Sequence, residues 1–258
     1  IIGVTLLTAI MPRMSRNAAD GDDEAVVADL TMGTKLTFIA LIPIIIFMTA
    51  LGPDIARALF AYGSFSPEAA NTLGLTISAS SFTLIPYALV MLHLRVFYAR
   101  EEAWTPTFII AGITGTKVLL SALAPYIARE PSHVVVLLGA ANGFGFVTGA
   151  LIGALLLRRK LGTLRARDVL RTSAWAAGAA VVGVAVVFGT RWLVRDVAGL
   201  HLPQALGRII GAPSLGNLIE VALLGILFLV ATGLVLSRSK LPEVQNLGRA
   251  MQRIPGMS

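Results

Sequence analysis

The chain contains no cysteine and only three histidines in 258 residues. The absence of cysteine excludes disulfide bonds, thiolate metal sites and a cysteine nucleophile, and the three histidines lie far apart in the sequence. Charged residues are also scarce, at 14% of the chain, against roughly 25% in a soluble domain. So little charge cannot cover a surface that faces water, which excludes an ordinary soluble enzyme and a disordered chain.

Sequence motifs for covalent chemistry are missing as well. We find no phosphate-binding loop, nucleophile elbow or paired catalytic carboxylates. The acidic run 20–24 lacks the ligand spacing of a calcium loop and predicts a solvated loop that caps the next helix. We therefore expect a protein that is not an enzyme and that uses no metal and no cofactor.

Long hydrophobic stretches dominate what is present, since 56% of the residues are hydrophobic. A helix needs about 20 mostly apolar residues to cross a bilayer. Six stretches meet this requirement: 36–53, 69–94, 104–128, 132–157, 172–190 and 214–237. A shorter stretch, 1–11, has neither the basic start nor the cleavage site of a signal peptide. We predict an all-α, polytopic transmembrane helix bundle, and we expect the chain to begin inside a helix of a longer protein.

Lysine and arginine divide unequally between alternate loops. Fourteen of them lie in one set of loops and five in the other, while Lys35 and Lys117 lie at or within the apolar stretches. Because basic loops stay in the cytoplasm, the larger set and the C-terminus are predicted to lie inside. The same division explains the net charge of +7 without a nucleic-acid partner.

Three polar residues are candidates for substrate or ion binding. Lys117 lies about 18 Å along a helix that begins at Thr105, where insertion of a lysine costs about 2.5–3.5 kcal/mol. Such residues usually face a cavity or a partner, although a lysine stem can also extend to the interface. Ser121, one turn later, shares the helix face and can accept from the ammonium. Lys35 is expected at the cytoplasmic start of its stretch, where reaching the interface suffices to explain it.

Other features of the stretches indicate packing. Glu220 lies about one turn into the last stretch, where the helix dipole stabilises a carboxylate. Pro43 and Pro86 predict kinks. Small residues four apart allow two helices to approach closely, and two such series occur in 132–157: Gly139 and Gly143, then Gly145, Gly149 and Gly153.

Three segments carry specific motifs. They are 3–12 followed by Met14-Ser15-Arg16, then 59–65, and then 95–106, which contains Phe97-Tyr98-Ala99 ahead of Thr105-Pro106. In this order they resemble the end of the eighth helix, the loop after the ninth, and the connection between the tenth and eleventh helices of the MurJ/MviN family of lipid II flippases. The resemblance implies the C-terminal part of a 14-helix, MATE-like flippase.

The resemblance further implies that the whole protein flips lipid II, the undecaprenyl-linked peptidoglycan precursor, across the bacterial inner (plasma) membrane by alternating access. Residues 1–171 would form lobe helices, a partial span and four full ones. Residues 172–237 would form two extra helices with a groove for the lipid tail. Residues 238–258 would be a basic cytoplasmic tail or linker, which binds membrane lipids or leads to an extension that binds cell-wall or signalling proteins. The family's essential arginines would precede residue 1.

A sodium site of some family members has an Asn and an Asp, four apart, in the eleventh helix. Counted from Thr105-Pro106, these positions fall on Lys117 and Ser121. The chain departs from the family's pattern here, and we hypothesise that it does not use sodium at this site because the ammonium of Lys117 replaces the ion. Two other functions stay open: a drug or ion antiporter of the same superfamily, and a non-transporting membrane scaffold for cell-wall synthesis. An antiporter should carry acidic residues within its spans, and only Glu220 is near one.

Overall fold

The computed structural model describes residues 12–61, 66–128, 130–197, 199 and 213–239. These residues are helical apart from short connections, with no strand in the described part of the chain, which confirms the all-α class. Six helical segments are long and apolar enough to cross a membrane: Asp23–Phe60, Pro67–Ala99, Trp104–Ile127, His133–Leu161, Ala166–Val197 and Leu215–Ser237. The six predicted spans are thereby confirmed, while the partial span 1–11 lies outside the described residues.

Helix α2 (Asp23–Phe60) begins 13 residues before the predicted stretch. Asp22 accepts a hydrogen bond from the backbone N–H of Ala25 over 2.9 Å, as a capping residue does. Asp23 and Glu24 occupy the first turn, where the helix dipole favours acidic side chains. The predicted cap is confirmed, while the position of Lys35 at the cytoplasmic start of its apolar stretch stays a prediction. Lys35 lies about 18 Å from the first residue of α2, because capped polar turns extend the helix beyond its apolar part.

The second candidate span is interrupted. It consists of α3 (Pro67–Ser80), the 3₁₀ turn η1 (Ser81–Thr83) and α4 (Leu84–Ala99). Pro86 lies in the first turn of α4, where the missing N–H is not needed. The interruption predicted at Pro86 therefore takes the form of the 3₁₀ turn η1, which lies just before the proline. Pro43, in contrast, lies inside the continuous helix α2.

The connection between α4 and α5 (Trp104–Ile127) is a tight helix C-terminus. The N–H of Glu101 donates to the carbonyl of Tyr98 over 3.1 Å, and the N–H of Glu102 donates to that of Phe97 over 3.0 Å. This pattern is a Schellman motif, and it requires a left-handed residue after the helix. Glu101 takes that conformation, with φ of 58°.

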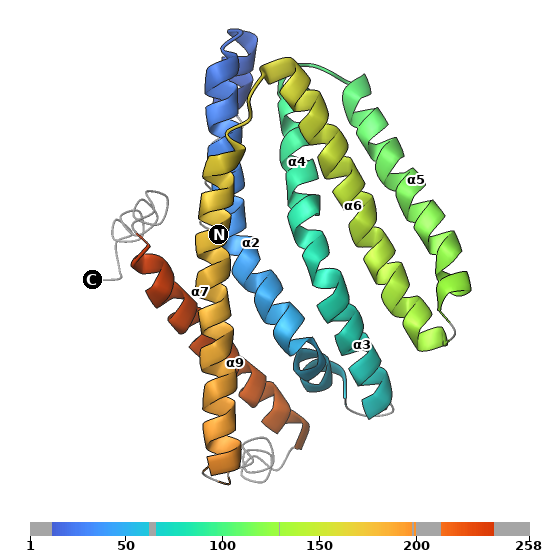
Figure 1. Cartoon of the computed structure of the whole chain (residues 1–258), viewed down its shortest axis with the longest axis vertical. Coiled ribbons are helices and arrows are strands. Elements are labelled where there is room, and N and C mark those ends of the chain that lie inside the picture. Colours follow the sequence, from blue (N-terminus) through green and yellow to red (C-terminus); the bar gives the residue numbers. More distant parts are fainter. Residues whose placement is uncertain (1–11, 62–65, 129, 198, 200–212, 240–258) are drawn as a thin grey trace. The chain divides into compact units, whose positions relative to one another are not determined.

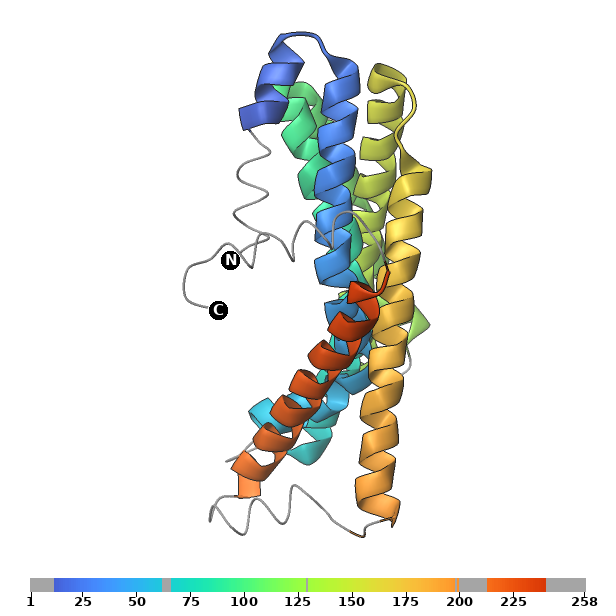
Figure 2. The same ribbon diagram turned by 90° about the vertical axis from the view of Figure 1, so that its left-hand side faces the viewer.

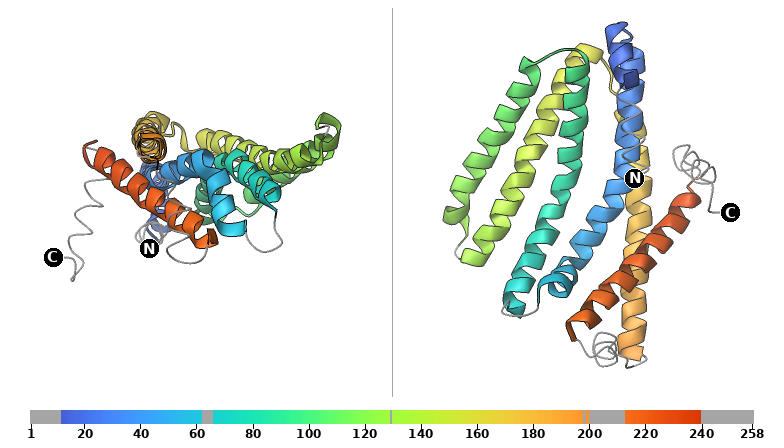
Figure 3. Two further views of the ribbon diagram at one scale, coloured as in Figure 1. Left: turned by 90° about the horizontal axis from the view of Figure 1, so that it is seen from below. Right: turned by 180° about the vertical axis from the view of Figure 1, so that it is seen from behind.

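The first of two compact units comprises Ile1–Leu41 and Ala79–Ser173. Within it, α6 (Pro131–Leu161) packs along α5 and α4, and the three helices lie side by side in Figure 1 and in the right-hand view of Figure 3. Gly149 makes this packing close, because a Cβ there would overlap the side chain of Ile113 and touch Val90. The predicted role of the glycine series is thus confirmed at this position. Large side chains that are fully buried in this unit are Val26, Val90, Val96, Phe97, Ile109 and Leu157.

The second unit comprises Ile42–Ser78 and Ala174–Ser258. It contains most of α7 (Ala166–Trp192), the π-helical turn η2 (Leu193–Val197) and α9 (Pro213–Ser237), which runs obliquely to α7 (Figures 1 and 2). Its core includes Phe228 of α9, whose ring centre lies 4.9 Å from that of Phe47. The predicted division into 1–171, 172–237 and 238–258 stays a prediction, and most of the last segment lies outside the described residues.

Candidate functional site

Lys117 of α5 is directed at the neighbouring helix α6. Its Nζ lies 3.8 Å from the centre of the Phe146 ring, a cation–π contact. Its carbon chain occupies the space that a Cβ on Gly145 would need. The ring of Tyr87, from α4, packs edge-on against Phe146 at 5.0 Å. Three helices therefore contribute to the surroundings of this ammonium, whose side chain is only half-buried.

The three predicted site residues do not form one cluster among the described contacts. Ser121 lies one turn beyond Lys117, yet the ammonium contacts the Phe146 ring, and no hydrogen bond joins the two residues in the described part of the chain. The pairing of Lys117 with Ser121 stays a prediction. Lys35 lies on α2 and is half-buried, whereas the described contacts of Lys117 are all with α6.

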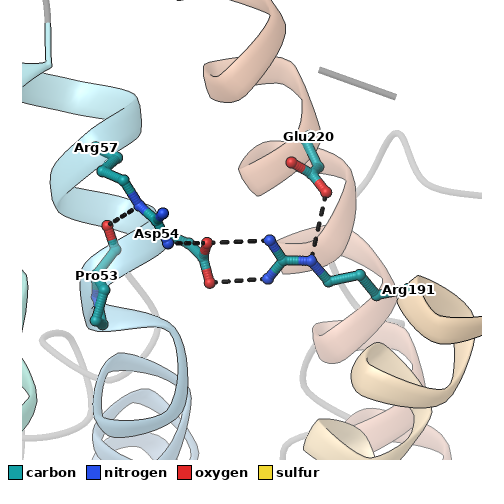
Figure 4. Close-up of polar contacts among 5 residues, drawn as sticks. All are labelled: Pro53, Asp54, Arg57, Arg191 and Glu220. Atoms are coloured by element: carbon teal, nitrogen blue, oxygen red, sulfur yellow. Dashed lines mark hydrogen bonds and ion pairs between the residues drawn. The ribbon is translucent and has the colours of Figure 1, made fainter. Parts of the chain in front are cut away.

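A second polar site lies in the other unit, where Arg191 reaches from the end of α7 toward α2 and α9 (Figure 4). Its Nη1 and Nη2 donate to the two carboxylate oxygens of Asp54 over 2.9 and 3.2 Å. Its Nε lies 3.7 Å from Oε1 of Glu220. Arg57 donates to Asp54 over 2.9 Å and to the carbonyl of Pro53 over 3.2 Å. We call Asp54, Arg57, Arg191 and Glu220 the four-residue ion-pair cluster.

The electrostatics of this cluster are balanced, because two carboxylates face two guanidinium groups. The side chains of Asp54 and Glu220 are 17% and 13% exposed, and that of Arg191 is 27% exposed. The planar guanidinium of Arg191 binds Asp54 in the two-pronged geometry that arginine prefers. The cluster therefore joins α2, α7 and α9 by partly buried charge-assisted hydrogen bonds and one looser ion pair.

Sequence reasoning missed this cluster. It assigned Arg57 and Arg191 to loops and attributed the stability of Glu220 to the helix dipole alone, which is incomplete because Arg191 faces this carboxylate. One signal was available. Asp54, Arg191 and Glu220 stand at the ends of three apolar stretches that the charge count assigns to the same membrane side. Unpaired charges at such positions are costly, so a mutual partner was to be expected.

Ion pairs also link helix ends within the first unit. Asp29 of α2 is 2% exposed and accepts hydrogen bonds from Arg13 and Asn17, which hold the helical segment 12–19 against α2. Three further ion pairs connect separate segments: Asp23 with Arg100, Glu102 with Lys160, and Glu24 with Arg165. Four basic residues of the set predicted to be cytoplasmic are therefore neutralised by acids of the same unit.

Glu102 stands in the connection between α4 and α5, outside the membrane-spanning segments. Burial by itself would raise the pKa of this carboxyl group. Hydrogen bonds from Lys160 and Thr105 and the charges of Lys160 and Arg100 outweigh burial, so the pKa lies below its ordinary 4.5.

Among the described residues, no group of three or more histidine, aspartate or glutamate side chains could hold a metal ion.

Comparison with known proteins places this architecture in a sequence family. The family model described as lipid II flippase MurJ matches residues 1–203, which covers every described helix except α9. A lipid II flippase MurJ of Burkholderia cenocepacia is 26% identical over 158 residues, 61% of this chain and 29% of the relative. Probable lipid II flippases MurJ of Synechocystis and Rhizobium meliloti are each 24% identical, over 96% and 75% of this chain. The chain spans 29% to 44% of the length of these three relatives.

Proposed function

The chain belongs to the lipid II flippase MurJ family, and on that premise we propose that it forms part of a transporter that moves lipid II across the bacterial inner membrane. The observation that carries this proposal is the family match over residues 1–203 of a chain with six helices long enough to span a membrane. The polar headgroup of lipid II would cross between helix surfaces that alternate in accessibility, without covalent chemistry. The chain contributes the C-terminal part of that path.

Transport is tested with the whole protein that carries this chain, because the chain spans less than half the length of its relatives. Its gene should restore growth to a bacterium whose own lipid II flippase is depleted, and lipid II should become accessible at the outer face of the membrane. Growth without outward lipid II would contradict transport and favour a scaffold. Lipid II that stays inside while drug or ion efflux appears would favour an antiporter.

Lys117 is the residue to which we assign a role in transport. A positive charge within α5 can bind an anionic group or take the position of a cation, and the Phe146 contact holds the ammonium without neutralising it. We retain the hypothesis that this charge replaces sodium, with Ser121 on the same helix face and Lys35 as a further candidate on α2. Support comes from the half-buried position of Lys117 in an apolar helix.

Substitutions at Lys117 test this role. In the whole protein, Lys117→Met keeps an unbranched apolar stem but removes the charge, and we expect it to abolish complementation at normal protein levels. Arg159→Met is the control, since it also removes a basic charge, from an exposed residue in the last turn of α6. Normal growth with Lys117→Met would show that the charge is dispensable. Sodium-dependent transport in the unmodified protein that vanished in Lys117→Asn would contradict the replacement of sodium.

The last two helices, within residues 172–237, are proposed to form the lipid groove. The outward face of α9 supports this role, because it exposes large apolar side chains: Leu223, Ile226, Leu229, Val230 and Leu234. The ion-pair cluster would keep α7 and α9 attached to α2 while a lipid tail occupies the groove. Partners that bind through residues after 239 remain a prediction, because that segment lies outside the described residues.

The C-terminus is proposed to lie in the cytoplasm, with the connection at Glu101 on the same side and Ser66 outside. The basis is the unequal division of lysine and arginine between the loops. Because the chain has no cysteine, single cysteines can report the orientation. A membrane-impermeant maleimide should label Ser66→Cys in intact cells and should label Glu101→Cys only after permeabilisation. The reverse pattern would overturn this orientation.

A further inference from the structure

A crevice of about 240 Å³ lies within the first unit, between α2, α4 and the start of α7. Its apolar lining includes Leu30 and Phe38 of α2, Leu89 of α4, and Val169 and Leu170 of α7. The volume is below the roughly 300–1,000 Å³ of pockets that enclose a drug-sized molecule. A narrow apolar crevice of this size fits a single hydrocarbon chain.

The hydroxyl groups along the wall are already satisfied by their own helices. The hydroxyls of Thr31, Thr34 and Ser173 donate to the carbonyls of Val27, Leu30 and Val169, over 2.7 to 2.8 Å. His93, which also lines the crevice, is 5% exposed. Its Nδ1 has no hydrogen-bond partner and lies against Gly153 of α6. The wall therefore offers mainly hydrocarbon and no free hydroxyl donor, a lining that suits an acyl chain better than a saccharide.

One charged residue, Arg165, lines the crevice at its edge. It directly precedes Ala166, the first residue of the 27-residue helix α7, and helix N-termini attract phosphate groups. Its partner Glu24 is 86% exposed and 3.3 Å away, so this ion pair is weak enough for an anionic ligand to replace it. Further exposed basic residues lie near it in the sequence: Arg158, Arg159, Lys160, Arg167 and Arg171, of which Lys160 is paired with Glu102.

We propose that this crevice binds one acyl chain of an anionic phospholipid of the surrounding membrane, with the lipid phosphate held by Arg165 at the edge. An apolar wall with a single basic group at its rim matches an amphiphile that has one apolar end and one negative end. The crevice differs from the proposed lipid groove in that no residue of α9 lines it, although α7 contributes to both. It does not depend on the transported substrate, and it would anchor the start of α7 to the membrane surface.

The experiment compares retention of phosphatidylglycerol and phosphatidylcholine, with identical acyl chains, by the purified full chain in native mass spectrometry. We expect phosphatidylglycerol to be retained about fivefold more strongly, the effect of one basic residue near an anionic lipid. Arg165→Gln should remove this preference. The matched control Arg167→Gln, exposed and not part of the crevice wall, should keep it. Val169→Phe fills the crevice and should lower retention of both lipids, with Ser173→Leu as a second filling variant.

Several outcomes would overturn the proposal. Equal loss of preference in Arg165→Gln and Arg167→Gln would indicate a diffuse attraction to the basic surface. Unchanged retention in both filling variants, with thermal unfolding near that of the parent chain, would place the lipid elsewhere. Undecaprenyl phosphate could instead displace phosphatidylglycerol from the parent chain but not from Val169→Phe. That result would assign the crevice to a transported lipid. None of these results depends on whether the whole protein flips lipid II, so the two proposals fail separately.

Discussion

Arg191 of α7 donates one hydrogen bond to each carboxylate oxygen of Asp54 of α2, over 2.9 and 3.2 Å. Both side chains are less than a third exposed. Removing one partner leaves the other charge with little water and with one remaining partner, Arg57 for Asp54 or Glu220 for Arg191. The lost two-pronged contact is not replaced, and this penalty usually exceeds the net gain from the pair itself. The pair should therefore be sensitive to single substitutions and much less sensitive to removal of both charges.

Asp54→Asn is expected to lower the free energy of unfolding by about 1–2 kcal/mol, less than the roughly 3–5 kcal/mol of a fully buried pair, because water reaches this one. Thermal unfolding of the purified protein in detergent measures the change. Asp196→Asn is the matched control, an exposed aspartate five residues beyond Arg191. The double variant Asp54→Asn/Arg191→Gln should cost little more than either single change. Fully additive effects would show that the two side chains do not interact.

Gly145→Ala should destabilise the packing of α5 against α6. A Cβ at Gly145 would overlap the side chain of Lys117 and come within 3.0 Å of the backbone carbonyl of Ile113. Overpacking of this kind costs about 1–3 kcal/mol. Gly115→Ala on α5 is the control, because nothing lies within 4 Å of its added Cβ, and alanine there should stabilise the helix by up to about 1 kcal/mol. A gain in melting temperature for both variants would contradict the close contact.

Glu102 should make stability depend on pH on the acid side. Its folded-state pKa is below the ordinary 4.5, so the folded protein binds the proton more weakly than the unfolded chain does. The contribution of Glu102 to the free energy of unfolding is therefore fully present above about pH 4.5. It is lost as the pH falls through the lower pKa of the folded state. Glu102→Gln should flatten the loss of thermal stability between neutral and acidic pH, whereas Glu101→Gln should leave it as it is. An unchanged acid profile in Glu102→Gln would refute the assignment.

Glu101→Gly should stabilise the end of α4. Glu101 has a φ of 58°, in the left-handed region that costs an ordinary residue roughly 1 kcal/mol and costs glycine nothing. The Schellman hydrogen bonds stay in place, since they use only backbone groups. We expect a gain of up to about 1 kcal/mol in thermal unfolding experiments. Glu101→Ala, which removes the carboxylate but keeps the Cβ, should bring no gain; an equal gain would point to charge rather than backbone strain.

Local properties of the sequence were sufficient to predict the number, order and class of the helices. In a bilayer every backbone polar group must be satisfied within the helix, so an apolar stretch of sufficient length has few alternatives. The glycine spacing that predicted a close helix contact for 132–157 is equally local, because residues four apart share one helix face. It did not identify the helices that pack there. Helix ends were less predictable. Capped acidic residues such as Asp22 and Asp23 extend α2 well beyond its apolar part.

Only the tertiary structure decided which charges meet. Asp54 and Arg191 are 137 positions apart, and no local pattern links them. The ring that faces Lys117 is likewise chosen by the packing of α5 on α6, although the cost of a lysine in a membrane already marked that residue for attention. Hydropathy is a sum over neighbours in the chain, whereas an ion pair depends on distances of a few ångströms between side chains that folding brings together.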